Sequence, residues 1–194
     1  KGVRKHGSRA DFDPSREISA AFENKTDDPA HARWDDLDAL VTALQQTPTT
    51  REAFERDIEP IFPLDDYLDR MIWVSLTQNG DAVAQNFFLY NAEDDGHDFW
   101  QLLPWDSNIA FGADWADPYN VIGPDKLFYL DGGNYFSKRL LRIAYYAHRY
   151  LERYRRVLDE VLTEAVVLGI HQRYRARVEN DLALDQIRWK RKIS

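Results

Sequence analysis

Cysteine is absent from the 194 residues, and so is any long hydrophobic run. Without cysteine the chain can form no disulfide, no thiolate metal site and no cysteine nucleophile. No apolar stretch approaches the roughly 20 residues that a membrane-spanning helix needs. The five histidines are scattered and form no HExxH pair, which disfavours a zinc site.

Positive charge is scarce in the first two thirds of the chain. Residues 1–137 carry 11 basic and 26 acidic side chains, net −15, whereas residues 138–194 carry 14 and 7, net +7. Between residues 65 and 131 only Arg70 and Lys126 are basic, against 13 acidic side chains. Such a segment repels phosphate unless cations neutralise it, which suggests a divalent-metal site. On charge alone, however, a solvated acidic surface is the favoured interpretation. The net charge of −8 argues against a nucleic-acid partner.

Large apolar side chains are plentiful, with ten Phe, ten Tyr and six Trp, and the length suits one domain with a sizeable core. Their spacing predicts a mostly helical chain with one β-hairpin. Two short aromatic segments, 86–90 and 99–103, flank an acidic turn and form the predicted hairpin. Residues 1–30 look polar and irregular apart from a short strand near 18–22, and residues 104–134 look like an irregular connection. Helices are expected over about 34–47, from Thr49 or Thr50 onward, over 64–75 with Pro63 at the first helical position, and over about 146–161 and 165–179.

Three polar residues flank the predicted hairpin. Asp81 precedes its first strand, Asn86 stands five positions later at the start of that strand, and Asp106 follows its second strand. Protein kinases use an Asp followed five residues later by an Asn, and a further Asp that binds magnesium. Because both flanks of one hairpin can meet at one of its ends, the three residues favour a phosphotransferase site. Ordinary turn, strand and helix-cap positions are the alternative for each of them.

Longer segments around these residues resemble the CotH-type (spore coat protein H) kinase family, a divergent branch of the protein-kinase fold. The specific part of the resemblance covers residues 79–112, with Gln85–Tyr90 and Leu103–Gly112 at its centre. Supporting similarity lies at residues 22–26, 34–37, 62–68, 139–141 and 185–189.

The resemblance implies an α+β fold, a mostly helical protein-kinase-like large lobe whose β-hairpin carries the active-site residues. Residues 1–194 would form a single CotH kinase-like domain without the N-terminal small lobe, with 1–30 hinge-like and 31–194 the large lobe. By position, Asp81 would be the catalytic aspartate, and Asn86 and Asp106 the magnesium ligands. Trp100 would lie near the nucleotide, where stacking on adenine is physically reasonable, and a place in the hairpin core is its alternative.

The implied activity is Mg²⁺- or Mn²⁺-assisted transfer of the ATP γ-phosphate to Ser/Thr hydroxyls of a protein substrate, outside the cytoplasm or on a cell or spore surface. A non-catalytic coat or cell-surface scaffold is the alternative. It is favoured by Asn108, where the family commonly has a second Asp, and by the lack of a Gly-rich loop and a phosphate-binding lysine. A glycosidase that uses Asp81 and Asp106 is a further alternative. Alone, the chain is expected to bind metal weakly and ATP poorly, to lack kinase activity and to self-associate.

Overall fold

The computed structural model describes residues 2–5, 12, 22–25, 34–83, 86–92, 97–107, 110–111 and 134–189. Of some of these it describes the backbone alone: residues 2–5, Asn24, Asp81, Ala92, His97, Asp98, Ala183, Gln186 and Trp189. The chain divides into two compact units, Lys1–Leu151 and Glu152–Ser194, and each is described by itself. The first unit contains the sheet and most of the helices, whereas the second is helical in its described part.

A four-stranded antiparallel sheet lies at the centre of the first unit, with the strand order β2-β1-β3-β4. Its strands are β1 (Gly2–Lys5), β2 (Phe22–Asn24), β3 (Phe87–Ala92) and β4 (His97–Pro104). Strands β3 and β4 are the predicted hairpin, in which Phe87 lies opposite Pro104 and Leu89 opposite Leu102. The prediction of the hairpin is therefore confirmed.

Strand β1 departs from the sequence prediction, which treated the first residues as irregular. It pairs with β3, Val3 opposite Leu89, and with β2, Val3 opposite Asn24. A strand of four residues, Gly-Val-Arg-Lys, has too little apolar alternation to be recognised, and its partner lies more than eighty residues away. Of the short strand predicted near residues 18–22, only Phe22 lies within the described residues, and it belongs to β2.

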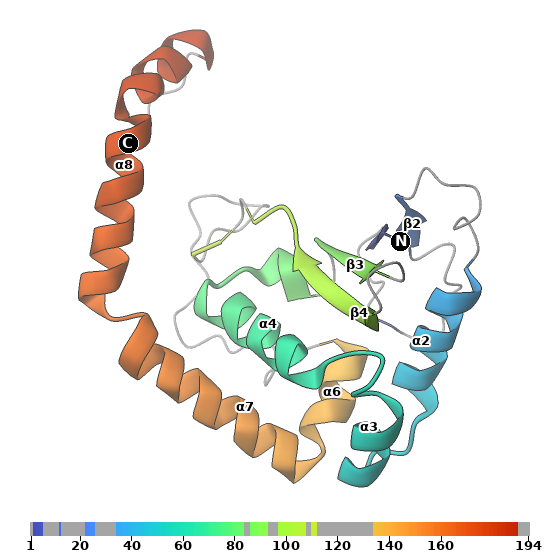
Figure 1. Ribbon diagram of the computed structural model, residues 1–194. Coiled ribbons are helices and arrows are strands. Elements are labelled where there is room, and N and C mark those ends of the chain that lie inside the picture. The colour runs from blue at the N-terminus through green and yellow to red at the C-terminus, as the bar shows by residue number, and fades with distance from the viewer. Residues whose placement is uncertain are drawn as a thin grey trace. The chain divides into compact units, whose positions relative to one another are not determined.

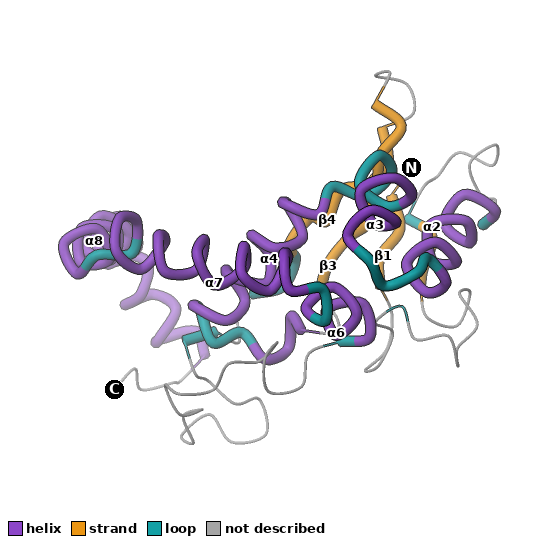
Figure 2. Tube along the Cα trace, turned by 90° about the horizontal axis from the view of Figure 1, so that it is seen from below, coloured by secondary structure: helices purple, strands orange, loops and turns teal. Residues whose placement is uncertain are grey.

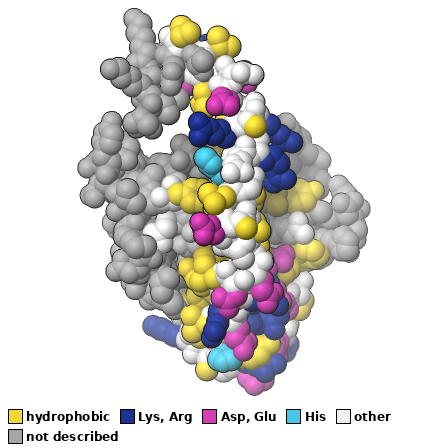
Figure 3. Space-filling view, turned by 90° about the vertical axis from the view of Figure 1, so that its left-hand side faces the viewer, with side chains coloured by type: hydrophobic (Ala, Val, Ile, Leu, Met, Phe, Trp, Pro, Cys, Tyr) yellow, Lys and Arg dark blue, Asp and Glu magenta, His cyan; other side chains and the backbone are white. Residues whose placement is uncertain are grey.

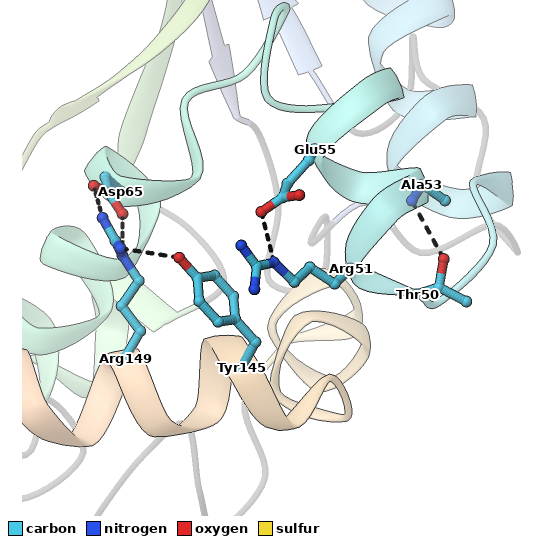
Figure 4. Close-up of polar contacts among 7 residues, drawn as sticks. All are labelled: Thr50, Arg51, Ala53, Glu55, Asp65, Tyr145 and Arg149. Carbon is cyan, nitrogen blue, oxygen red and sulfur yellow. Dashed lines mark hydrogen bonds and ion pairs between the residues drawn. The ribbon is translucent and has the colours of Figure 1, made fainter.

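Three helices follow β2 as predicted. They are α2 (Asp35–Gln46), α3 (Arg51–Asp57) and α4 (Leu64–Leu76). The Thr50 hydroxyl caps α3 by accepting the backbone N–H of Ala53 at 3.3 Å (Figure 4). Pro63 is the N-cap of α4 and not its first helical residue, one position from the prediction. Helix α4 runs beside the β3–β4 hairpin in both views (Figures 1 and 2).

After residue 133 the chain forms α6 (Tyr135–Leu141) and α7 (Ala144–Arg156). Asn134 caps α6 in a capping box: its side chain accepts the Ser137 N–H at 2.8 Å, and the Ser137 hydroxyl accepts the Asn134 N–H at 2.9 Å. The ring of Phe136 in α6 then lies against the rings of Phe12, Phe54, Phe62 and Tyr67, at centroid distances of 5.0–6.3 Å. This aromatic cluster joins α3, α4 and α6 into one core.

Polar contacts connect the first part of α7 to α3 and α4 (Figure 4). The Arg149 Nε donates to Asp65 Oδ1 at 2.7 Å, and another nitrogen of the same guanidinium donates to the Tyr145 hydroxyl at 3.2 Å. The Arg51 guanidinium lies over the Tyr145 ring, 3.7 Å from its centroid, and donates to Glu55 at 2.7 Å. The hydrogen bonds to Asp65 raise the pKa of Arg149, so the guanidinium stays charged at any ordinary pH.

The second unit consists of the end of α7, a π-helical turn (Val157–Val161) and the long helix α8 (Glu164–Trp189). The exposed side chains of this unit mix apolar and charged residues along the helical surface (Figure 3). Among the described residues, no helix combines the length and the apolar character needed to cross a membrane.

The expectation of a mostly helical α+β fold with one hairpin is confirmed. The assignment of residues 1–30 as hinge-like and of 31–194 as a large lobe stays a prediction. Most of the expected irregular connection over residues 104–134 lies outside the described residues.

Candidate functional site

Two of the predicted site residues meet at one end of the hairpin. Asn86 immediately precedes β3, and Asp106 lies two residues beyond the end of β4. The Asn86 side-chain amide donates to the backbone carbonyl of Asp106 at 3.3 Å, and the Trp105 N–H donates to the carbonyl of Asn86 at 3.1 Å. The Asp106 side chain is exposed and that of Asn86 is half-buried, and the Asn86 amide lies beside the Asp106 backbone.

The backbone at this end of the hairpin adopts an uncommon conformation. Among the described non-glycine residues, five have a positive φ, and four of them are Gln78 (53°), Asn86 (57°), Asp106 (51°) and Phe111 (57°). Their segments converge, because the N–H of Phe111 donates to the carbonyl of Thr77, next to Gln78 at the end of α4. Left-handed backbone is unfavourable for residues with a Cβ, and Asn and Asp tolerate it best. Such conformations cluster at functional sites.

Asp81 lies in η2, a 3₁₀ turn (Gly80–Val83) between α4 and β3. Its backbone is described and its side chain is not, so the direction of its carboxylate stays a prediction. Two buried side chains hold the backbone that follows it: Arg70 donates to the carbonyl of Ala82 at 2.6 Å, and Asn134 donates to the carbonyl of Val83 at 3.1 Å. The position of this turn is therefore set by contacts from α4 and from the start of α6.

Trp100 lies in the middle of β4 and is 4% exposed. Its backbone N–H donates to the carbonyl of Ile61, in the loop before α4, at 2.7 Å. This burial agrees with the alternative that Trp100 is a core residue of the hairpin. Its contact with adenine stays a prediction. A more exposed indole near the site is that of Trp105, which is 49% exposed and packs edge-on against Phe88 with 5.3 Å between centroids.

The described part of the chain contains no group of three or more His, Asp or Glu side chains that could hold a metal ion. The described oxygen donors at the hairpin end are the carboxylate of Asp106 and the amide of Asn86. Mg²⁺ is commonly bound by one or two carboxylates, with water and substrate phosphates completing its shell. The donors present therefore fit a metal that arrives with a nucleotide better than a site made of protein ligands alone.

The family model described as "CotH kinase protein" matches residues 4–193, nearly the whole chain. The chain belongs to the CotH kinase family. A search of curated proteins found no significant match. Membership in the CotH kinase family makes the chain kinase-like, and the match includes Asp81, Asn86, Trp100 and Asp106.

Sequence reasoning missed three residues of this CotH kinase-like site. They are Arg70 and Asn134, which hold η2 from outside, and Asn79, whose side-chain oxygen accepts the N–H of Ala82 at 3.2 Å. For Arg70 a signal existed, because it is one of only two basic residues between positions 65 and 131. For Asn134, the pattern Asn-x-x-Ser before an apolar turn marks a helix cap but gives no hint of its contact with Val83.

Proposed function

We propose that this chain carries the phosphotransfer site of an atypical kinase, which moves the γ-phosphate of ATP to a Ser or Thr hydroxyl of a protein. The observation that carries the proposal is the hydrogen-bonded meeting of Asn86 and Asp106, both with left-handed backbone, at one end of the hairpin. Membership in the CotH kinase family supports it, and the Ser/Thr acceptor comes from the family resemblance alone.

In this proposal Asn86 and Asp106 are the metal ligands. A carboxylate and an amide carbonyl are hard oxygen donors suited to Mg²⁺ or Mn²⁺. When bound, the metal would supply positive charge that offsets the charge of the nucleotide phosphates. Asp106 adds a full negative charge from an exposed position, whereas Asn86 adds a dipole and keeps Asp106 close through its hydrogen bond.

Asp81 is the proposed catalytic residue. Its carboxylate would accept a hydrogen bond from the acceptor hydroxyl and orient it in line with the phosphate, then take up its proton. η2, which bears Asp81, is separated from Asn86 by two residues, so the two side chains originate from neighbouring positions along the chain. Trp100 is buried in the core, and its proposed place near the nucleotide rests on the family resemblance.

The test compares the complete gene product with its Asp81→Asn variant, using γ-labelled ATP, Mg²⁺ and a Ser/Thr-containing acceptor protein. We expect the variant to lose about 1,000-fold in transfer rate while its calorimetric affinity for ATP and Mg²⁺ changes little. Asp38→Asn is the matched control, since Asp38 is an exposed aspartate in the first turn of α2. Transfer by Asp81→Asn at the wild-type rate would contradict the catalytic role of Asp81.

A non-catalytic scaffold is the second candidate function, favoured by Asn108, where the family commonly has an Asp. Asn108 lies outside the described residues. This candidate predicts no heat of ATP binding, no thermal shift with ATP and Mg²⁺, and no phosphate transfer by the wild-type protein. Those three results together would replace the kinase proposal with the scaffold.

A further inference from the structure

Arg70 is a charged side chain in a place where an apolar one would ordinarily stand. It projects from the buried face of α4, which also carries Met71, Ile72 and Val74, and is only 8% exposed. Burying a guanidinium is unfavourable unless hydrogen bonds compensate for the lost water. Arg70 donates to the Ala82 carbonyl at 2.6 Å, and its guanidinium lies 4.9 Å from the centroid of the Phe87 ring.

These two contacts lie beside the two proposed functional residues. Ala82 directly follows Asp81, and Phe87 directly follows Asn86. A single rigid, planar group thus contacts both the turn that bears the proposed catalytic residue and the first residue of the strand that follows a proposed metal ligand. No other described basic side chain lies between residues 65 and 131.

The turn itself needs support from outside. η2 has only four residues, and 3₁₀ turns have poorer hydrogen-bond geometry than α-helices. Its Ala82 N–H is accepted by both the backbone and the side-chain oxygen of Asn79, at 3.1 and 3.2 Å. Its last carbonyl, that of Val83, is held by Asn134, whose own Oδ1 accepts the Tyr67 hydroxyl at 2.8 Å.

We propose that Arg70 is a positioning residue, which together with Asn134 fixes the backbone after Asp81 so that its carboxylate is held at a constant place relative to Asn86. This inference rests on the proposed phosphotransferase function. Arg70 acts through the Ala82 carbonyl and makes no contact with substrate. Because a misplacement of about 1 Å can cost on the order of 100-fold in rate, its loss is expected to lower turnover more than nucleotide affinity.

The variants separate an effect on the position of η2 from an effect on the stability of the fold. Arg70→Met keeps a long apolar stem beneath Phe87 and removes the donor to Ala82. Arg70→Lys keeps the positive charge and an N–H donor group but lacks the planar guanidinium, so it tests whether turnover is partly rescued. Asn134→Asp is nearly isosteric: it keeps the oxygen that caps α6 and removes the N–H₂ donor to Val83. Arg56→Met is the matched control, because Arg56 is an exposed residue paired with Asp57 on α3.

In the complete gene product, Arg70→Met should lower kcat on the order of 100-fold with the KM for ATP changed less than about threefold, and Arg70→Lys should regain part of the loss. Asn134→Asp should also lower kcat, and Arg56→Met should not. Hydrogen exchange supplies a second readout: the Ala82 amide should exchange at least about tenfold faster in Arg70→Met, while the amides of β3 and β4 keep their protection.

The inference is overturned if Arg70→Met keeps kcat within about threefold of wild type, or if exchange quickens equally throughout the sheet, which would mark a general loss of stability. If the wild-type protein transfers no phosphate, the phosphotransferase proposal fails, and the exchange of Ala82 alone then decides whether Arg70 holds this turn. Unchanged Ala82 exchange in both Arg70→Met and Asn134→Asp would reject that role.

Discussion

The side-chain amide of Asn86 donates to the backbone carbonyl of Asp106 at 3.3 Å, so the two chain segments at the open end of the hairpin are joined through both proposed metal ligands. A second hydrogen bond joins the same two segments: the N–H of Trp105 donates to the carbonyl of Asn86 at 3.1 Å. A change in the position of one residue is therefore transmitted to the other. Substitutions that change either the backbone strain or the side-chain chemistry, but not both, can separate strain from function at this site.

Asn86 allows such a separation because its φ is 57°. Asn86→Ala places a less tolerant residue in left-handed backbone and should destabilise the fold by about 1–2 kcal/mol. Asn86→Gly accepts that backbone and should cost less. If the Asn86 side chain binds metal, both variants lose phosphate transfer alike, although their urea midpoints differ. Recovery of transfer in Asn86→Gly alone would show that Asn86 matters only for its backbone.

Asp106 tests the charge of the site without disturbing the fold. Its side chain is exposed, and Asn tolerates left-handed backbone as Asp does, so Asp106→Asn should change stability by less than about 0.5 kcal/mol. Replacing the charged carboxylate by a neutral amide should weaken Mn²⁺ binding at least about tenfold, measured by calorimetry in the presence of ATP. Equal Mn²⁺ affinity in Asp106→Asn and wild type would remove Asp106 from the ligand set.

The fold was predictable where the signals were local. The apolar spacing in α2 and α4, the Thr50 cap and the aromatic strands of the hairpin are patterns within a few residues, and the structure has these elements there. Strand β1 was not predicted, because its four residues become a strand through pairing with β3, and no local sequence pattern encodes that pairing.

The proximity of Asn86 and Asp106 was predictable from the sequence, but the contacts around them were not. Spacing and resemblance singled out Asn86 and Asp106, and the structure brings them together. The contacts of Arg70 and Asn134 become visible only when α4 and α6 are packed against η2, since each side chain binds a backbone carbonyl, and a carbonyl is present at every residue. Side-chain partners that bind backbone atoms leave no complementary residue in the sequence.

The ion pair between Arg149 and Asp65 should contribute modestly to holding α7 on α4. Both side chains are partly exposed, at 36% and 41%, and exposed pairs are worth about 0.2–1 kcal/mol. A double-mutant cycle with Arg149→Met and Asp65→Asn, followed by urea unfolding, should give a coupling in that range which shrinks in 1 M NaCl. A coupling that does not change with salt would show that packing of the arginine stem, and not charge, joins the helices.

The core contains a buried hydroxyl, that of Tyr146. Tyr146 in α7 is 3% exposed, and within the described part of the chain its hydroxyl makes no hydrogen bond. A buried polar group without a partner is destabilising, so Tyr146→Phe should stabilise the protein by about 1 kcal/mol at pH 7. Tyr145→Phe is the contrasting control, because the Tyr145 hydroxyl accepts a hydrogen bond from Arg149, and its loss should not stabilise the fold.

Alkaline pH should enlarge the advantage of Tyr146→Phe. Burial, with smaller contributions from Glu55 and Glu59, raises the pKa of Tyr146 from 10 to about 12. Above pH 10 the unfolded chain therefore releases this proton first, and the wild-type protein loses stability as the pH rises from 10 toward 12. Phenylalanine has no proton to release, so urea unfolding at pH 9, 10 and 11 should show a difference between the two proteins that grows with pH. A difference that stays constant across these three values would mean that Tyr146 ionises equally readily in the folded and unfolded states.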